Sequence, residues 1–197
     1  MRIVAAAALS TVIATVTLAL IVSTANARIV DYSSSTYRIT FSELEFVAGS
    51  VTNTCAITLE GSLHARTMTK VLNSLMGYIT RAEANNCRVV TTLLTETLPW
   101  HVRYRGFSGN LPNITLLLIR ARANFQVATC LASAEFDARL TRTPSTGALT
   151  GLSVPTNANL PLTGILCPAP RLGSLRSNRN GTITQLNSST LITVTLI

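Results

Sequence analysis

Apolar and polar residues alternate with a period of two over most of the chain, a pattern typical of β-strands that bury one face. The clearest alternation covers 119–127, and a second covers 132–141. A third surrounds the single tryptophan and places Trp100, Val102 and Tyr104 on one face of a strand. The sequence therefore predicts a core built from strands rather than helices.

The strand that contains the tryptophan is followed by turn signals. His101, Arg103 and Arg105 lie on its opposite face, and glycines and an asparagine over 106–110 then predict a turn. The segment 111–113 starts the next strand. We expect a hairpin with an aromatic inner face and a cationic outer face.

Further short strands follow from the same reading, with turns rich in Gly, Pro, Asn and Ser between them. They are expected at 37–46, with a bulge at Ser42-Glu43, and at 55–64, 75–84, 89–94, 148–154, 181–185 and 191–197. The segments 65–74 and 155–161 are predicted to be loops. The fold class is all-β: an antiparallel β-sandwich of about 8–10 strands, with a closed β-barrel as the alternative.

The N-terminal segment 1–27 has the features of a signal peptide. An apolar run without charges over 3–22 follows Arg2, and Ala25-Asn26-Ala27 fits the small-x-small cleavage rule. The alternative is an uncleaved anchor, because about 20 apolar residues can span a bilayer. With cleavage, we expect a flexible lead at 28–36, a single all-β domain at 37–197, no integral membrane association, and a secreted or cell-surface location.

Four cysteines lie in the part expected to be exported, with no spacing suited to zinc. Disulfides are expected in an oxidising compartment, and Cys55–Cys87 with Cys130–Cys167 is the favoured pairing. Each bond would close a loop of about 33–38 residues and contribute about 3–4 kcal/mol. The alternative is a set of free buried thiols.

The charge is strongly positive. Without Arg2, the 16 basic residues become 15 against 8 acidic ones, a net charge of +7, and Lys70 is the sole lysine. Such a field favours polyanions, which include teichoic acids and anionic lipid surfaces. A preference for arginine over lysine is also typical of GC-rich genomes and would produce the same charge without any polyanionic partner.

Four arginines fall in phase on two neighbouring strands. Arg103 and Arg105 share one strand face, and Arg120 and Arg122 share a face of the next strand, with His101 beside them. Guanidinium groups bind phosphate and carboxylate as two-pronged donors, so this patch could hold an anionic cell-envelope polymer. The alternative is a solvated face whose charge prevents aggregation. No nucleic acid partner is expected.

Catalytic motifs are sparse. The exported part has no Gly-x-Ser-x-Gly elbow, calcium loop or phosphate-binding glycine loop, so no metal or cofactor is expected. Glu135 and Asp137 share a strand face and are near enough for glycoside cleavage, but their neighbours are those of a solvated face. A hydrolase would need a polar cleft that joins one of them to His101.

Two short motifs carry a resemblance. They are Leu98-Pro99-Trp100 and Tyr104-x-Gly106-Phe107-x-Gly109-x-Leu111-Pro112-Asn113-Ile114, and the likeness extends roughly over 55–130. This region resembles uncharacterised small secreted proteins of high-GC Gram-positive bacteria. The resemblance implies export and a β-rich domain, and it implies no activity.

Taken together, the residues favour a secreted, non-enzymatic domain that binds at the cell surface. Two other functions stay open. One is a carrier of small apolar ligands, with a cavity lined by Trp100, Phe125, Ala132 and Ala134. The other is a hydrolase whose site is too dispersed to recognise in the sequence.

Overall fold

The computed structural model describes residues 29–110, 113–165, 167, 169 and 171–196. These residues form fourteen strands and one short 3₁₀ turn, η1 (Thr95–Thr97). The strands are β1 (Ile29–Tyr32), β2 (Thr36–Ala48), β3 (Val51–Leu63), β4 (Thr67–Thr69), β5 (Leu75–Asn85), β6 (Thr91–Leu93), β7 (Trp100–Asn110), β8 (Asn113–Val127), β9 (Cys130–Arg142), β10 (Leu149–Ser153), β11 (Asn157–Thr163), β12 (Leu172–Ser177), β13 (Thr182–Gln185) and β14 (Val194–Leu196).

Eight of the strands pair in a closed antiparallel ring, in the order β2-β3-β5-β7-β8-β9-β11-β12 and back to β2. A sheet closed in this way is barrel-like. The barrel is flattened, because the rings of Phe46 in β2 and Phe125 in β8 meet across the interior with centroids 4.9 Å apart. The expected all-β, antiparallel fold is confirmed, and its opposite walls pack directly, as sandwich layers do.

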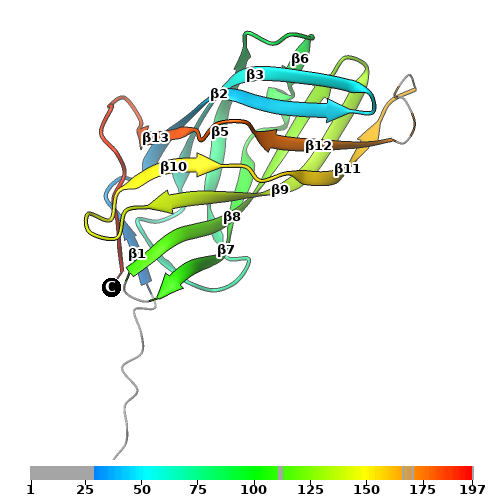
Figure 1. Ribbon diagram of the computed structural model, residues 1–197. Coiled ribbons are helices and arrows are strands. Elements are labelled where there is room, and N and C mark those ends of the chain that lie inside the picture. Colours follow the sequence, from blue (N-terminus) through cyan, green and yellow to red (C-terminus); the bar gives the residue numbers. More distant parts are fainter. Residues whose placement is uncertain (1–28, 111–112, 166, 168, 170, 197) are drawn as a thin grey trace, which may run out of the picture.

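The remaining strands extend or cover this barrel. In Figure 1, the hairpin β2–β3 crosses the top, β7 to β9 form the lower wall, and the small sheet β14-β1-β4 lies at one end. The flexible lead predicted for 28–36 is corrected over 29–32, which forms β1 with Val30 and Tyr32 buried. The loops predicted for 65–74 and 155–161 are also corrected, the first over Thr67–Thr69, which forms β4, and the second from Asn157 onwards, where β11 begins.

The alternation of residue types builds the barrel wall. Along β9, the inward side chains of Ala132, Phe136, Ala138 and Leu140 are buried, while the alternate positions point outwards. The predicted bulge at Ser42-Glu43 is confirmed by a shift of register between β2 and β3. The period of two therefore decides which side chains form the core.

Two disulfides tie strands to neighbouring segments, with the pairing expected from the sequence. Cys55 in β3 bonds Cys87, and Cys130 at the start of β9 bonds Cys167. Bonds of this kind indicate an oxidising, non-cytoplasmic environment. Among the described residues, no helix combines the length and the apolar character needed to cross a membrane.

Candidate anion-binding face

The outer surface of β7, β8 and β9 gathers five arginines, which we call the arginine face. The buried positions of β7 are Trp100, Val102 and Tyr104, so its intervening side chains point outwards. Strand pairing sets Arg103 opposite Arg120, Arg120 opposite Asp137, and Arg122 opposite Glu135. The face consists of Arg103, Arg105, Arg120, Arg122 and Arg139, with the carboxylates Glu135 and Asp137. Five positive and two negative charges leave it a net charge of +3.

One of these arginines is neutralised by a two-pronged ion pair. Arg120 donates from Nε to Asp137 Oδ1 at 2.7 Å and from Nη2 to Oδ2 at 3.1 Å. This bond lowers the pKa of Asp137, and the positive charges of Arg105 and Arg139 lower it further. The same bond raises the pKa of Arg120. Asp137 is therefore ionised at neutral pH, and its carboxylate takes up the hydrogen-bond donors of Arg120 in the ion pair.

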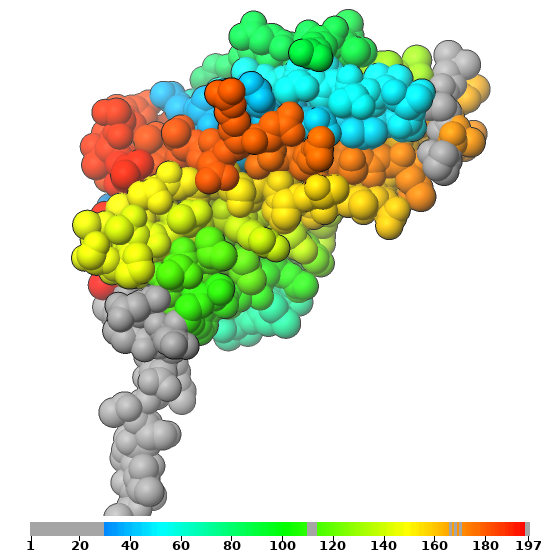
Figure 2. Space-filling view, in the orientation of Figure 1, coloured from blue at the N-terminus to red at the C-terminus, as the bar shows by residue number. Residues whose placement is uncertain are grey.

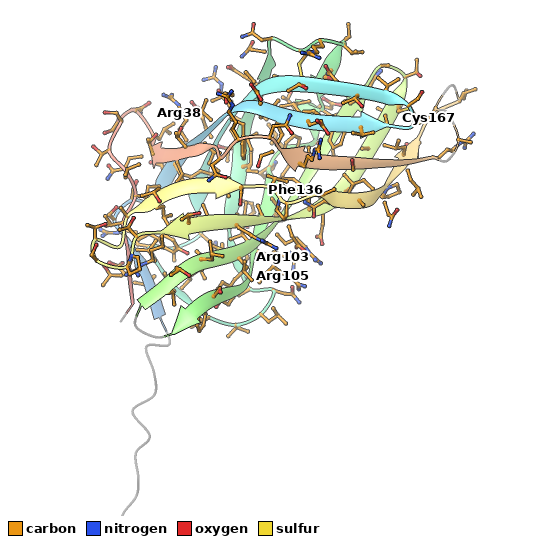
Figure 3. The ribbon with its side chains drawn as sticks, in the orientation of Figure 1. Arg38, Arg103, Arg105, Phe136 and Cys167 are labelled. Atoms are coloured by element: carbon orange, nitrogen blue, oxygen red, sulfur yellow. A yellow bond between two sulfur atoms is a disulfide. The ribbon has the colours of Figure 1, made fainter. Side chains whose placement is uncertain are left out.

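Three other expected site residues have different surroundings. Arg122 donates to the hydroxyl of Ser133 at 3.2 Å. The Nε of Arg103 is buried and has no hydrogen-bond partner among the described residues. His101 is exposed and its ring packs against Tyr78, with centroids 5.4 Å apart. Figure 3 shows Arg103 and Arg105 on the same outer side of the barrel.

A groove of about 630 Å³ lies on the part of the arginine face that contains Arg105, Asp137 and Arg139. The connection between β10 and β11 forms one wall and is fixed to β9 by reciprocal hydrogen bonds. The Asp137 N–H donates to Asn157 Oδ1 at 2.8 Å, and Asn157 Nδ2 donates to the Asp137 carbonyl at 3.0 Å. The lining residues are Arg105, Ser108, Leu116, Leu118, Ile119, Asp137, Ala138, Arg139, Pro155, Thr156 and Asn157.

Two arginines that line this groove are not neutralised by a carboxylate of the described residues. Arg105 donates from Nη1 to the amide oxygen of Asn73 at 2.7 Å, which orients the guanidinium without neutralising it. Neither Arg105 nor Arg139 forms an ion pair with a described residue. Because Asp137 is satisfied by Arg120, an anionic group in the groove would meet two positive charges in excess.

The sequence indicated part of this site. The alternation in β9 places Arg139 on the outer face, but nothing local in the sequence brings Arg139 next to Arg105, which lies on the second strand away. That neighbourhood depends on the registers of two strand pairs. The wall at Pro155 and Asn157 falls where a loop was expected.

Among the described residues, this groove does not join His101 to Glu135 or Asp137. His101 and Glu135 do not line it, and Asp137 is held in its ionised form by Arg120. A general acid for glycoside cleavage needs a raised pKa, which is the opposite shift. Within the described part of the chain, no three His, Cys, Asp or Glu residues form a group that could hold a metal ion.

The interior holds a separate, apolar cavity of about 60 Å³. Inward side chains such as Tyr37, Phe41 and Phe136 line it (Figure 3 labels Phe136). The carrier hypothesis expected a cavity lined by Trp100, Phe125, Ala132 and Ala134. None of these four residues lines the observed cavity, so that expectation is corrected. A cavity of roughly 150 Å³ is known to hold benzene, and this one is smaller.

Comparison of the chain with protein-family models, with curated proteins and with solved structures finds no match.

Proposed function

We propose that this chain is a secreted, non-enzymatic binding domain whose arginine face contacts anionic polymers of the cell envelope. One observation carries the proposal: Arg105 and Arg139, which form no ion pair with any described residue, border a single groove on a face with a net charge of +3. Arg103 and Arg122 extend the positive surface beyond the groove.

The form of the face suits an extended polymer better than a small compact ligand. The arginines are spread along three adjacent strands, and Figure 2 shows the green surface of β7 and β8 continuous with the yellow surface of β9 and β10. Repeated phosphate or carboxylate groups would contact several guanidinium groups at once, and such multiple contacts add avidity. Exposed charge pairs are screened by salt, so binding should be salt-dependent.

The two other functions receive less support from the structure. The lowered pKa of Asp137 disfavours a general acid at the groove. The interior cavity of about 60 Å³ is small for a carried ligand. An anion-binding role is the function that the surface charges favour.

Retention on isolated bacterial cell envelope along a salt gradient tests the proposal. The double variant Arg105→Gln/Arg139→Gln should elute at clearly lower salt than the unmodified chain, because two unpaired charges are lost. The matched control is Arg88→Gln/Arg171→Gln, which removes two exposed arginines outside the arginine face. Equal elution of the two double variants would refute a role for this face, and no retention at low salt would refute the proposal.

A further inference from the structure

A second surface lies beside the arginine face, at the turn between β4 and β5. Val71 and Leu72 are 60% and 59% exposed. Among the described residues they are the only two large hydrophobic side chains that are consecutive in the chain and both exposed. Single exposed apolar residues are common on proteins, but an adjacent pair at the tip of a turn is a small apolar protrusion.

The turn is held in place rather than loosely attached. Ser74 N–H donates to the Val71 carbonyl at 3.0 Å, and Asn73 adopts a left-handed φ of 65°. Two further backbone bonds join the turn to β7: Asn73 N–H to the Tyr104 carbonyl at 2.8 Å, and Tyr104 N–H to the Ser74 carbonyl at 2.9 Å. The aliphatic pair is thus presented by a fixed backbone, with little ordering cost on binding.

Positive charges flank the apolar pair on both sides. Lys70 precedes it and places Nζ 5.4 Å from the centroid of the Phe107 ring. Arg105 bonds the side chain of Asn73 from the other side and continues into the groove of the arginine face. In Figure 2, the turquoise residues of this region emerge at the lower edge, next to the green of β7.

The N-terminal part of the described chain meets the same turn. Ile29 in β1 pairs with Thr69 in β4, the residue directly before Lys70. In the sequence, Ile29 is preceded by Arg28, the first residue after the predicted cleavage site, and by the apolar run 3–22. Ile29, the first described residue, therefore lies in the strand beside β4, which leads into this turn.

We infer that the turn 70–73 docks on an anionic lipid bilayer, with Val71 and Leu72 entering the headgroup–acyl boundary and Lys70 and Arg105 contacting lipid phosphates. This inference rests on the proposed function in so far as Arg105 belongs to both surfaces. Aliphatic residues beside basic ones are the combination that binds peripheral proteins to anionic leaflets. A protein partner fits less well, because stable protein interfaces bury about 800 Å² on each side and exclude charge from their centre.

Flotation with lipid vesicles tests the inference. The chain from Arg28 onwards contains every described strand, and it should bind phosphatidylglycerol vesicles but not phosphatidylcholine vesicles. The variant Val71→Ser/Leu72→Ser should bind the anionic vesicles about tenfold more weakly. The matched control, Val90→Ser/Ile165→Ser, removes two exposed aliphatic residues elsewhere and should bind as the unmodified chain does.

A parallel titration with inorganic polyphosphate separates this inference from the proposed function. Polyphosphate offers anionic groups without acyl chains, so Val71→Ser/Leu72→Ser should bind it normally. The docking inference alone would be overturned if the unmodified chain bound polyphosphate but not vesicles. It would also be overturned if the two serine double variants bound vesicles equally, or if the unmodified chain bound both lipids equally. If the unmodified chain bound neither vesicles nor polyphosphate, the proposed function would be overturned as well.

Discussion

At the scale of single residues, Asp137 decides how much positive charge the groove presents. Its carboxylate is bonded by Arg120 and also lies near Arg105 and Arg139, so it acts as an internal competitor for an incoming anion. The side chain of Asp137 is about half exposed, at 49%, so the ion pair contributes little to stability, roughly 0.2–1 kcal/mol.

Replacing this carboxylate should strengthen anion binding. Asp137→Asn raises the net charge of the face from +3 to +4 and frees Arg120, so affinity for polyphosphate at pH 7 should rise by about three- to tenfold. Glu43→Gln is the matched control, because it removes one carboxylate from β2 on the opposite wall. Titration calorimetry measures both, and an unchanged affinity for Asp137→Asn would contradict the competitor role.

The pH dependence of stability follows from the same ion pair. Because the pKa of Asp137 is lowered in the fold, its stabilising contribution is present above the ordinary value of 3.8 and is lost as the pH falls through the folded value. Urea unfolding should therefore show Asp137→Asn slightly less stable than the unmodified chain at pH 7. The difference in stability should vanish when the pH falls below the folded pKa of Asp137.

At the scale of elements, two glycines allow β3 and β5 to approach where the barrel wall bends. A Cβ at Gly61 would collide with the Tyr78 carbonyl oxygen, and one at Gly77 would collide with the Ser62 carbonyl oxygen. The hydroxyl of Tyr37 also donates to the Tyr78 carbonyl, at 3.0 Å, and the register of β3 and β5 shifts at Gly61. Glycines at such bends help a sheet to curve and close.

The substitution Gly61→Ala should therefore destabilise the fold by about 1–3 kcal/mol, since the added methyl group meets backbone that cannot move freely. Gly151→Ala is the comparison, because its Cβ would meet only the Asn180 side chain, at 3.5 Å or more. Urea unfolding midpoints compare the two variants. If both midpoints fall equally, the close approach of β3 and β5 is not what constrains Gly61.

The direction of side chains along a strand could be predicted from the sequence, whereas some whole strands could not. The period of two identified the inner and outer faces of β7, β8 and β9, and therefore the outward arginines, because side-chain direction depends only on the strand itself. The sequence missed β1, which directly precedes a Ser-rich segment, and β11, which contains Pro161 and the left-handed Asn159. It also missed β4, which lies within a predicted loop, and β12. β1 pairs with β4 and β14, which are distant in the chain. β11 pairs with the nearby β12 and with β9, and this pairing overrides its unfavourable local composition.

The candidate site was predicted in part for the same reason. Arg103, Arg105, Arg120 and Arg122 could be placed on one surface from their strand phases. The pairing of Arg120 with Asp137 and the arrival of Arg139 beside Arg105 depend on the register between β8 and β9. A change of register by one residue would turn these side chains to the opposite face, and no local motif fixes that register.

At the scale of the whole molecule, closure of the sheet organises the polar surface as well as the core. The interior takes most of the large apolar side chains, and β7, β8 and β9 become one continuous wall on which charges from three strands combine. Two disulfides fix strand ends in an oxidising environment. The resulting rigid surface suits binding with little loss of conformational entropy.

The most direct test of the proposed anion-binding role is the dissociation constant for inorganic polyphosphate, measured at several salt concentrations. The unmodified chain should bind at low salt and weaken steadily as salt rises. Arg105→Gln/Arg139→Gln should bind about tenfold or more weakly at low salt, with a shallower salt dependence, while Arg88→Gln/Arg171→Gln should stay close to the unmodified chain. A dissociation constant that is insensitive to salt, or equally changed in both double variants, would contradict binding at the arginine face.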